Sequence, residues 1–232
     1  MEAGAKVHSM LPLRDENPTR TFPGFTVLLI ALNLAVFFYE ASLPGPLRQE
    51  MVMRRGLVPG VITNLPSLGS EAFGSGLLSV LTSMFLHGDV LHLGGNMLYL
   101  WIFGNNIEDR LGHMRFVAFY LACGLAAAAT QVAALPGSLV PMVGASGAIA
   151  GVLGAYLLIF PKARILTVVP FFIFLHFVRI PAYLVLGLWF IFQILHSLMA
   201  DASGGGVAWF AHIGGFVAGM LFLVIFLPRR RR

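Results

Sequence analysis

The chain has 232 residues, of which 58% are hydrophobic and 11% are charged, and its mean hydropathy is +0.85. Soluble domains carry about 25% charged residues. The polar side chains here are too few to cover a water-facing surface, which excludes a soluble globular protein. The net charge of +5 does not indicate a nucleic-acid partner, because the basic residues are placed as a membrane topology requires. We expect an integral membrane protein surrounded by the lipid bilayer.

The first part of the chain predicts a polar tail, a membrane helix and a long outer loop. Residues 1–23 are polar and predict a cytoplasmic tail, whereas residues 24–43 are apolar and predict the first membrane helix. In the loop that follows, Leu47–Met53 is amphipathic and suits a helix lying in the membrane interface. Leu77–Leu86 is apolar but short, so we expect it to dip into the membrane without crossing.

Six apolar segments lie near the length of roughly 17–25 residues that a transmembrane helix needs. They predict an all-α, polytopic membrane domain over residues 24–227, built as a bundle of six transmembrane helices. A further apolar run, Ile165–Val178, is shorter and contains Pro170, so we expect an interfacial segment and not a seventh span. Residues 228–232 predict a basic cytoplasmic tail. The predicted spans are 24–43, 90–107, 114–135, 142–160, 182–200 and 207–227.

The distribution of basic residues predicts the orientation of this bundle. With the N-terminus inside, twelve of the fifteen Lys and Arg residues fall on the inner side, and Arg48, Arg54 and Arg55 are the exceptions. A bias of this kind toward the cytoplasm sets the topology of membrane proteins. We therefore expect both termini in the cytoplasm and the protein in a cell (inner) membrane, with the basic tail beside anionic lipid.

Ser146 and His212 are reactive side chains near the starts of apolar segments, where polar groups are costly. Ser146 lies in the sequence Gly-Ala-Ser-Gly at residues 144–147, and His212 is followed by an isoleucine and two glycines. Spans two, four and six all run from outside to inside. At a rise of about 1.5 Å per residue, Asn96, Ser146 and His212 lie roughly 6–9 Å below the outer ends of their helices. The three residues can therefore form one site.

Small residues predict close contact between the fourth and sixth spans. Stripes of small residues let helix backbones approach closely in lipid. A serine–histidine hydrogen bond needs about 2.6–3.2 Å between heavy atoms, so a serine nucleophile with a histidine base requires this approach. The stripes are Gly147, Gly151 and Ala155 in the fourth span, and Gly215 and Gly219 in the sixth.

His92 and Asn96 are four residues apart and therefore share a helix face. The Asn96 amide can donate a hydrogen bond to a developing oxyanion, and the Ser146 backbone N–H, at a helix start, is a second donor. A rival interpretation is a metal site formed by His87, His92 and Asn96. Zinc needs three or four good ligands, and no thiolate is positioned to help. We therefore expect no metal.

In their order and helix placement, these motifs resemble the rhomboid family of intramembrane serine proteases over most of residues 25–227. The sequence Glu-Asp-Arg-Leu-Gly at 108–112 is similar to an acidic-basic loop motif of that family. The other matching pieces are His87, His92 with Asn96, the Gly-Ala-Ser-Gly motif around Ser146, and Ala211-His212 followed by glycines.

The resemblance implies that Ser146 is the nucleophile and that His212 is the general base and later the general acid. It implies an oxyanion hole formed by Asn96 and the Ser146 backbone amide, with His92 assisting, and places His87 near the mouth of the site. The implied substrate is a transmembrane segment of another membrane protein, cut near its outer end by a serine endopeptidase. No metal, ATP or other cofactor is implied.

The residues predict a Ser-His dyad in place of a triad, because no Asp or Glu falls within the depth of the site. The group that orients His212 stays open. Many relatives place an aromatic residue one turn after the serine, but this chain has Ala150 there. Tyr99 and Trp209 are then the candidates, and for Gln193 we expect structural hydrogen bonding.

Two other functions fit parts of this pattern. A catalytically inactive relative would bind membrane clients without cutting them, but the chain keeps both Ser146 and His212. A small transporter would use His92, Asn96 and His212 as a polar path, but we detect neither an internal repeat nor an intramembrane carboxylate to support it. In the protease interpretation, the glycine link at 204–206 suits a flap over the site.

Overall fold

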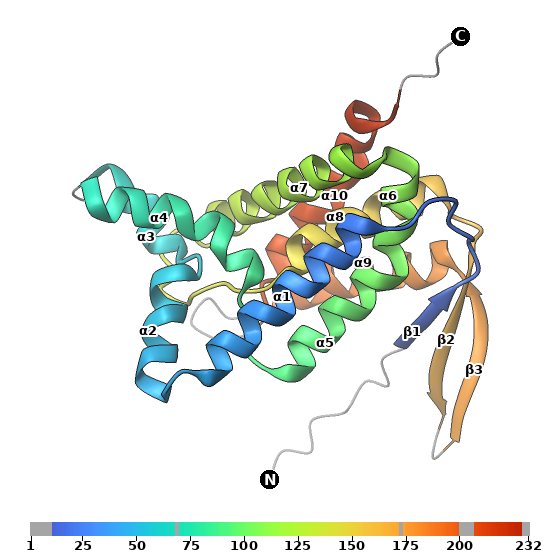
Figure 1. Cartoon of the computed structure of the whole chain (residues 1–232), viewed down its shortest axis with the longest axis horizontal. Helices are drawn as coiled ribbons and strands as arrows, with labels where there is room; N and C mark the ends of the chain where they lie inside the picture. Colours follow the sequence, from blue (N-terminus) through green and yellow to red (C-terminus); the bar gives the residue numbers. More distant parts are fainter. Residues whose placement is uncertain (1–10, 68–69, 172–173, 200–206, 229–232) are drawn as a thin grey trace.

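The structure is a computed structural model that describes residues 11–67, 70–171, 174–199 and 207–228. It is a bundle of helices with a small three-stranded sheet at one end (Figure 1). Its helices in this part of the chain are α1 Gly24–Ser42, α2 Gly45–Arg55, α3 Pro59–Asn64, α4 Ser70–Thr82, α5 Val90–Tyr99, α6 Asn105–Leu111, α7 His113–Ala134, α8 Ser146–Ile159, α9 Ala182–Met199 and α10 Trp209–Phe226. Shorter turns are η1 Leu65–Ser67, η2 Ser83–Phe85 and the π-helical turn η3 Leu100–Gly104, and the strands are β1 Leu11–Asp15, β2 Arg164–Phe171 and β3 Phe174–Pro181.

The helices confirm a mostly helical, polytopic membrane protein with several apolar spans. Among the described residues, α1, α7, α9 and α10 are each long and apolar enough to cross a bilayer. The stretches Phe73–Phe85 and Val90–Leu111 pass the same test as a pair, bent by 77°, and α8 is apolar but shorter. Each of the six predicted segments is helical over most of its length, and six crossings stay a prediction.

The sheet is the part of the fold that the all-α prediction missed. Its strand order is β1-β2-β3, and both pairings are antiparallel. The predicted interfacial run Ile165–Val178 forms most of the β2–β3 hairpin, in agreement with its rich content of Val, Ile and Phe, which favour strands. Strand β1 comes from the predicted N-terminal tail, where Leu11 pairs with Val168. Residues 11–15 are therefore an ordered edge of the sheet.

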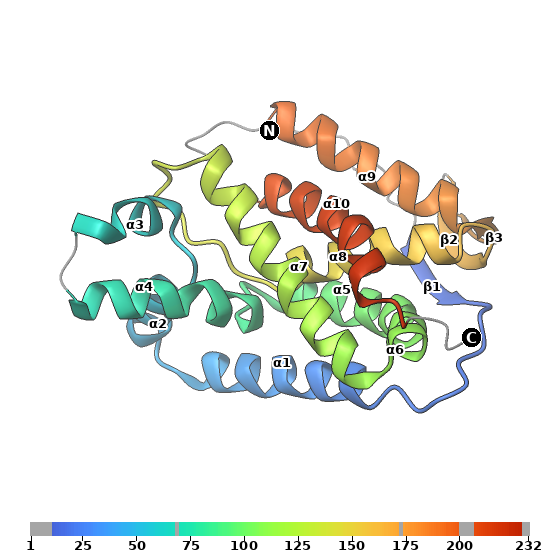
Figure 2. The ribbon, with the colours of Figure 1, turned by 90° about the horizontal axis from the view of Figure 1, so that it is seen from above.

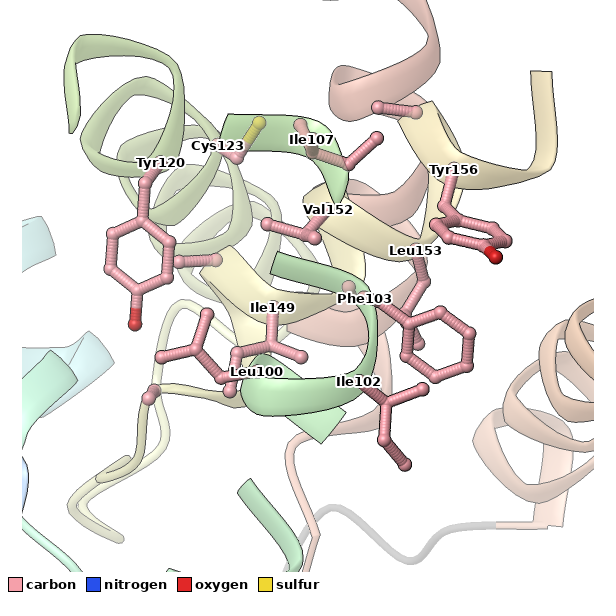
Figure 3. Packing of buried hydrophobic residues seen from close by; sticks show 14 of the residues in the cluster. Leu100, Ile102, Phe103, Ile107, Tyr120, Cys123, Ile149, Val152, Leu153 and Tyr156 are labelled. Atoms are coloured by element: carbon pink, nitrogen blue, oxygen red, sulfur yellow. The ribbon is translucent and has the colours of Figure 1, made fainter. Parts of the chain in front are cut away.

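Helix α8 is the centre of the bundle, between α1 at one edge and α9 at the other (Figure 2). Every residue from Gly147 to Tyr156 is buried, as expected for a helix that is apolar on all sides. Figure 3 shows side chains of η3, among them Leu100 and Phe103, against side chains of α8. The rings of Phe103 and Tyr156 meet edge to face at 4.9 Å. This packing fixes α8 against the second predicted span.

Helices α8 and α10 touch through their backbones, as the small-residue stripes predicted. A Cβ atom at Gly215 would overlap the carbonyl oxygen of Gly147, and one at Gly219 would overlap the carbonyl oxygen of Gly151. Close approach of this kind is the purpose of small residues between membrane helices. We call these four glycines the α8–α10 seam.

Two carboxylates at the sheet end of the bundle make contacts that hold the start of α1 and strand β1 in place. The buried Glu108 accepts the backbone N–H groups of Phe25 and Thr26 at 2.9 and 2.7 Å, which satisfies donors that a helix start leaves open. Asp15 accepts the Tyr156 hydroxyl at 2.8 Å. Burial raises the pKa of Asp15 above its usual value. The acidic motif at 108–112 therefore has a structural role in this fold.

Candidate active site

A cavity of about 640 Å³ lies at the end of the bundle where α5, α8 and α10 begin. It brings together five of the residues singled out in the sequence, which come from these three helices: His92, Asn96, Tyr99, Ser146 and His212. Its remaining wall is largely apolar. Its polar lining consists of Asp89, His92, Asn96, Tyr99, Ser146 and His212, and its apolar lining includes Leu91, Met142, Val143, Ile149, Leu153, Trp189 and Val207.

Ser146 and His212 form a hydrogen-bonded pair at the top of the α8–α10 seam. The distance between His212 Nε2 and Ser146 Oγ is 2.8 Å. Ser146 is the first residue of α8 and is partly exposed to the cavity, whereas His212 is only 8% exposed. The helix begins four residues later than predicted, because Met142 pairs with Leu57 in an isolated β-bridge and the chain enters α8 from extended backbone.

Gln193 of α9 makes the second polar contact of His212, which sequence reasoning had not anticipated. Its side-chain oxygen Oε1 lies 2.7 Å from His212 Nδ1. Of the two residues named as candidates, Trp209 contacts His212, with the rings edge-on at a centroid distance of 6.2 Å, whereas Tyr99 packs against Phe103 at 5.9 Å. A single amide within an apolar segment was the available signal, because polar groups in lipid need partners.

Asn96 and His87 form a second hydrogen-bonded pair. Asn96 Nδ2 lies 3.0 Å from His87 Nε2, and Asn96 is 8% exposed. His87 is fully buried, so the structure places it behind Asn96 and not at an exposed mouth of the site. His87 does not line the cavity, and its Nε2 can hold one N–H of the Asn96 amide. The other N–H of Asn96 stays available for a ligand.

His92 lies against Gly144 in the extended stretch before α8. Gly144 has a φ of +122°, and a Cβ atom there would lie 2.7 Å from His92 Nε2. Glycine is therefore needed for its backbone conformation and for the space that His92 occupies. Asp89 caps the start of α5 by accepting the backbone N–H of His92 at 2.9 Å. This cap orients the first turn that carries the histidine.

An ion pair that the sequence reasoning missed supports the loop of His87. Glu40, at the end of α1, has a fully buried side chain, and its Oε1 lies 3.4 Å from Arg48 Nε. Its Oε2 accepts the His87 backbone N–H at 3.4 Å, and Arg48 donates to the Gly88 carbonyl oxygen at 3.0 Å. Glu40 lies inside the predicted first span, so the expectation that the spans hold no carboxylate is wrong. This residue was the available signal, because such groups are rare in membrane segments and need partners.

Two further expectations concern a flap and a metal. The glycine link at 204–206 lies outside the described residues. Within the described ranges, no three His, Cys, Asp or Glu side chains gather in a way that could hold a metal ion.

Comparison with known proteins identifies the family of this chain. The family model of the rhomboid domain matches residues 75–229. The chain is 34% identical over 157 residues to Rhomboid protein 1, mitochondrial, of Saccharomyces cerevisiae, covering 62% of this chain and 40% of that protein. It is 35% identical over 135 residues to Rhomboid protease GluP of Bacillus subtilis, covering 58% and 24%. Over 199 residues it is 28% identical to Rhomboid-related protein 2 of Mus musculus, covering 85% and 62%.

In each comparison the chain spans less than two thirds of the relative's length. The match of the family model nevertheless covers more than half of this chain, including Ser146 and His212. The chain belongs to the rhomboid family.

Proposed function

We propose that the protein is an intramembrane serine endopeptidase that works through a Ser146–His212 dyad. The observation that carries the proposal is the distance of 2.8 Å between His212 Nε2 and Ser146 Oγ, beside a cavity in a bundle of apolar helices. A nucleophile and a base within hydrogen-bond reach are the signature of covalent catalysis. Family membership, and a relative named a rhomboid protease, support the same activity.

The proposed reaction is acyl transfer to serine followed by hydrolysis. His212 Nε2 takes the hydroxyl proton while Ser146 Oγ attacks the carbonyl carbon of the scissile peptide bond. The C–N bond then breaks, and the imidazolium gives its proton to the leaving nitrogen. A water molecule, deprotonated by His212, attacks the acyl-enzyme ester, which releases a carboxylate and restores the Ser146 hydroxyl. Activity is expected to fall at low pH, because a protonated His212 cannot act as the base.

Two donors are available for the negative charge that develops on the carbonyl oxygen. The Ser146 backbone N–H belongs to the first turn of α8, whose N–H groups have no acceptor within the helix and whose dipole favours an anion. Asn96 is held by His87 and keeps a second N–H for the same oxygen. His92, on the cavity wall, assists. Such donors stabilise the transition state, each by a factor of about 10²–10³.

The substrate is proposed to be a transmembrane segment of another membrane protein. The largely apolar wall of the cavity suits side chains that leave lipid, and its polar groups are gathered around Ser146. Because Ser146 begins α8 and does not lie at its middle, cleavage would fall near one end of the substrate helix. By the bias of basic residues this is the outer end, with the termini of the protease in the cytoplasm.

The test is cleavage of a reporter membrane helix by the purified full chain in liposomes. The parent is expected to cut, and Ser146→Ala and His212→Ala are expected not to cut. Ser197→Ala is the matched control, because it removes a buried hydroxyl whose bond is to the Ile194 carbonyl oxygen on the same helix. Cleavage that persists in Ser146→Ala would overturn the proposal.

A fluorophosphonate that labels the parent but not Ser146→Ala would show an activated serine even with an unsuitable reporter. Absence of both labelling and cleavage in the parent would favour an inactive, client-binding relative. Solute flux that survives Ser146→Ala would favour a transporter.

A further inference from the structure

Gln193 presents an oxygen, and not an amide N–H, to His212. Its Nε2 donates to the Trp189 carbonyl oxygen one turn earlier on α9, at 3.2 Å. Its Oε1 then faces His212 Nδ1 at 2.7 Å. The side chain is 5% exposed and is therefore largely shielded from water. An amide oxygen can only accept a hydrogen bond, and the proton of this bond must therefore sit on His212 Nδ1.

This arrangement decides which nitrogen of a neutral His212 is the base. A neutral imidazole carries one proton, and a proton on Nδ1 leaves the lone pair on Nε2. Nε2 is the atom that lies 2.8 Å from Ser146 Oγ. In the other tautomer, Nε2 would carry the proton and could not accept one from serine. An amide in a soluble triad that selects the wrong tautomer costs about 10⁴ in rate, which gives the scale of the effect.

Gln193 stands apart from the reacting atoms. It comes from α9, and His212 lies between it and the cavity, whose lining includes Trp189 of the same helix but not Gln193. It is therefore a positioning residue. A neutral amide also orients the imidazole without placing a second charge among apolar helices, where a carboxylate would be costly.

The contact between Gln193 and His212 exists only while α9 lies against α10. Near His212 the two helices meet through rings: Phe190 stacks on Phe216 at 4.4 Å, and His196 stacks on Trp209 at 4.7 Å. A hydrogen bond of 2.7 Å is lost when the helices part by about 1 Å, because it weakens steeply beyond its normal range of about 2.7–3.2 Å. The tautomer of His212 is thus tied to the position of α9.

We infer that Gln193 fixes the proton of His212 on Nδ1, so that Ser146 is activated only while α9 is docked against α10. The inference rests on the proposed protease function and adds a third, uncharged member to the dyad. It also gives α9 a role in regulating the site, because any movement of this helix away from α10 switches off the base.

The first experiment compares Gln193→Met, which removes the acceptor at similar size, with Gln193→Glu, which keeps an acceptor oxygen in either protonation state. Gln193→Met is expected to lower kcat by about 10²–10⁴-fold, the usual share of a general base, with KM unchanged. Labelling of Ser146 by a fluorophosphonate should slow in parallel, and Gln193→Glu should recover part of the loss. Ser197→Ala, which removes another buried polar group of α9, should retain the parental kcat.

The second experiment measures the tautomer directly, by ¹⁵N NMR of the His212 ring in histidine-labelled protein. The resonance is assigned by its absence in His212→Ala. The parent is expected to show the proton on Nδ1, and Gln193→Met a mixture of both tautomers. Phe190→Ala leaves Gln193 in place but loosens α9, and should shift the mixture in the same direction by a smaller amount. This readout needs no substrate, so it separates a failure of the inference from a failure of the protease function.

A merely structural role of Gln193 predicts a different result. Gln193→Met would then lower thermal stability while each folded molecule kept the parental kcat and the Nδ1 tautomer, and that outcome would overturn the inference. A tautomer that changes in Gln193→Met but not in Phe190→Ala would overturn the dependence on α9 docking. The parent could also show the Nδ1 tautomer, and Gln193→Met the mixture, in a protein that neither cuts nor is labelled. Gln193 would then still be the group that orients His212, and only the protease function would be refuted.

Discussion

Helices α8 and α9 both flank His212, but they are attached to α10 in different ways. α8 meets α10 backbone to backbone along the seam, where any Cβ atom at Gly215 or Gly219 overlaps a carbonyl oxygen. α9 meets α10 through side chains, and its own glycine, Gly187, has open space where a Cβ atom would lie. In the first half of α9 the buried residues are Ala182, Val185 and Leu186, and in the second half they are Gln193 and Ser197.

The difference shows how the site divides two tasks. The Ser146–His212 distance is set by a contact that cannot be shortened or tilted without moving backbone, because packed backbones leave no adjustable atoms. The orientation of the His212 ring is set by a helix whose contacts are rings and one amide, which can separate and re-form. The distance between Ser146 and His212 is therefore rigid, whereas the nitrogen of His212 that acts as the base depends on contacts that can change.

The largest effect is expected from a glycine-to-alanine substitution in the α8–α10 seam, compared with the same substitution on α9. Gly219→Ala forces α8 and α10 apart, and a displacement of about 1 Å at the reacting atoms can cost about 10² in rate. Overpacking of this kind also destabilises by about 1–3 kcal/mol. Gly187→Ala on α9 should leave cleavage unchanged and stabilise the fold slightly, because it reduces the freedom of the unfolded chain. Cleavage rates and thermal unfolding of the two variants, measured together, check the prediction. Equal cleavage rates and equal stabilities would refute the claim that the seam sets the Ser146–His212 distance.

A smaller effect is expected where the chain enters α8. Gly144→Ala places a side chain at a φ of +122° and against His92. Strain of this kind costs about 1–3 kcal/mol, which corresponds to roughly a tenfold to hundredfold loss if it falls on the transition state. Gly137→Ala, in the same loop before α8 but with open space around it, is the matched control. If Gly144→Ala cut at the parental rate, the seam alone would be enough to position Ser146.

The smallest effect is expected from the ring contacts of α9. His196→Leu removes the stack on Trp209, and an aromatic pair contributes about 0.5–1.5 kcal/mol. We expect cleavage to fall by about twofold to tenfold through kcat, because a looser α9 holds Gln193 less well. Leu195→Ala, at a side chain that is 48% exposed on the same helix, should have no effect. A loss as large as that of Gly219→Ala would mean that α9 is as rigid as the seam.

The features that the sequence predicted well are those encoded by local patterns. Apolar length identifies the helices, and stripes of small residues identify the faces that meet, so the pairing of Ser146 with His212 followed from residues near each of them. Gln193 could be noticed but not assigned, because the neighbour of a lone amide depends on how α9 is rotated, and packing against Phe216 and Trp209 sets that rotation.

The sheet was beyond reach for a different reason. Strand β1 is short, begins in a polar tail and finds its partner far along the chain, where Leu11 pairs with Val168. No local pattern encodes such a pairing. The carboxylate of Glu40 was a missed signal of the opposite kind: its position in an apolar segment is visible in the sequence, but its partner Arg48 becomes evident only once α2 folds back beside the end of α1.

The pairing of β1 also dictates an order of assembly. Asp15 and the Tyr156 hydroxyl that it accepts are 141 residues apart, so the N-terminal strand must wait until more than half of the chain has been synthesised and α8 has been inserted. Closing so long a loop comes after the local helices have formed, because its entropy must be offset by contacts already present. The first residues of the described chain thus find their place only after β2 has been made. A docked β1 therefore requires α8 to be in place, and Ser146 lies at the opposite end of this helix from Tyr156.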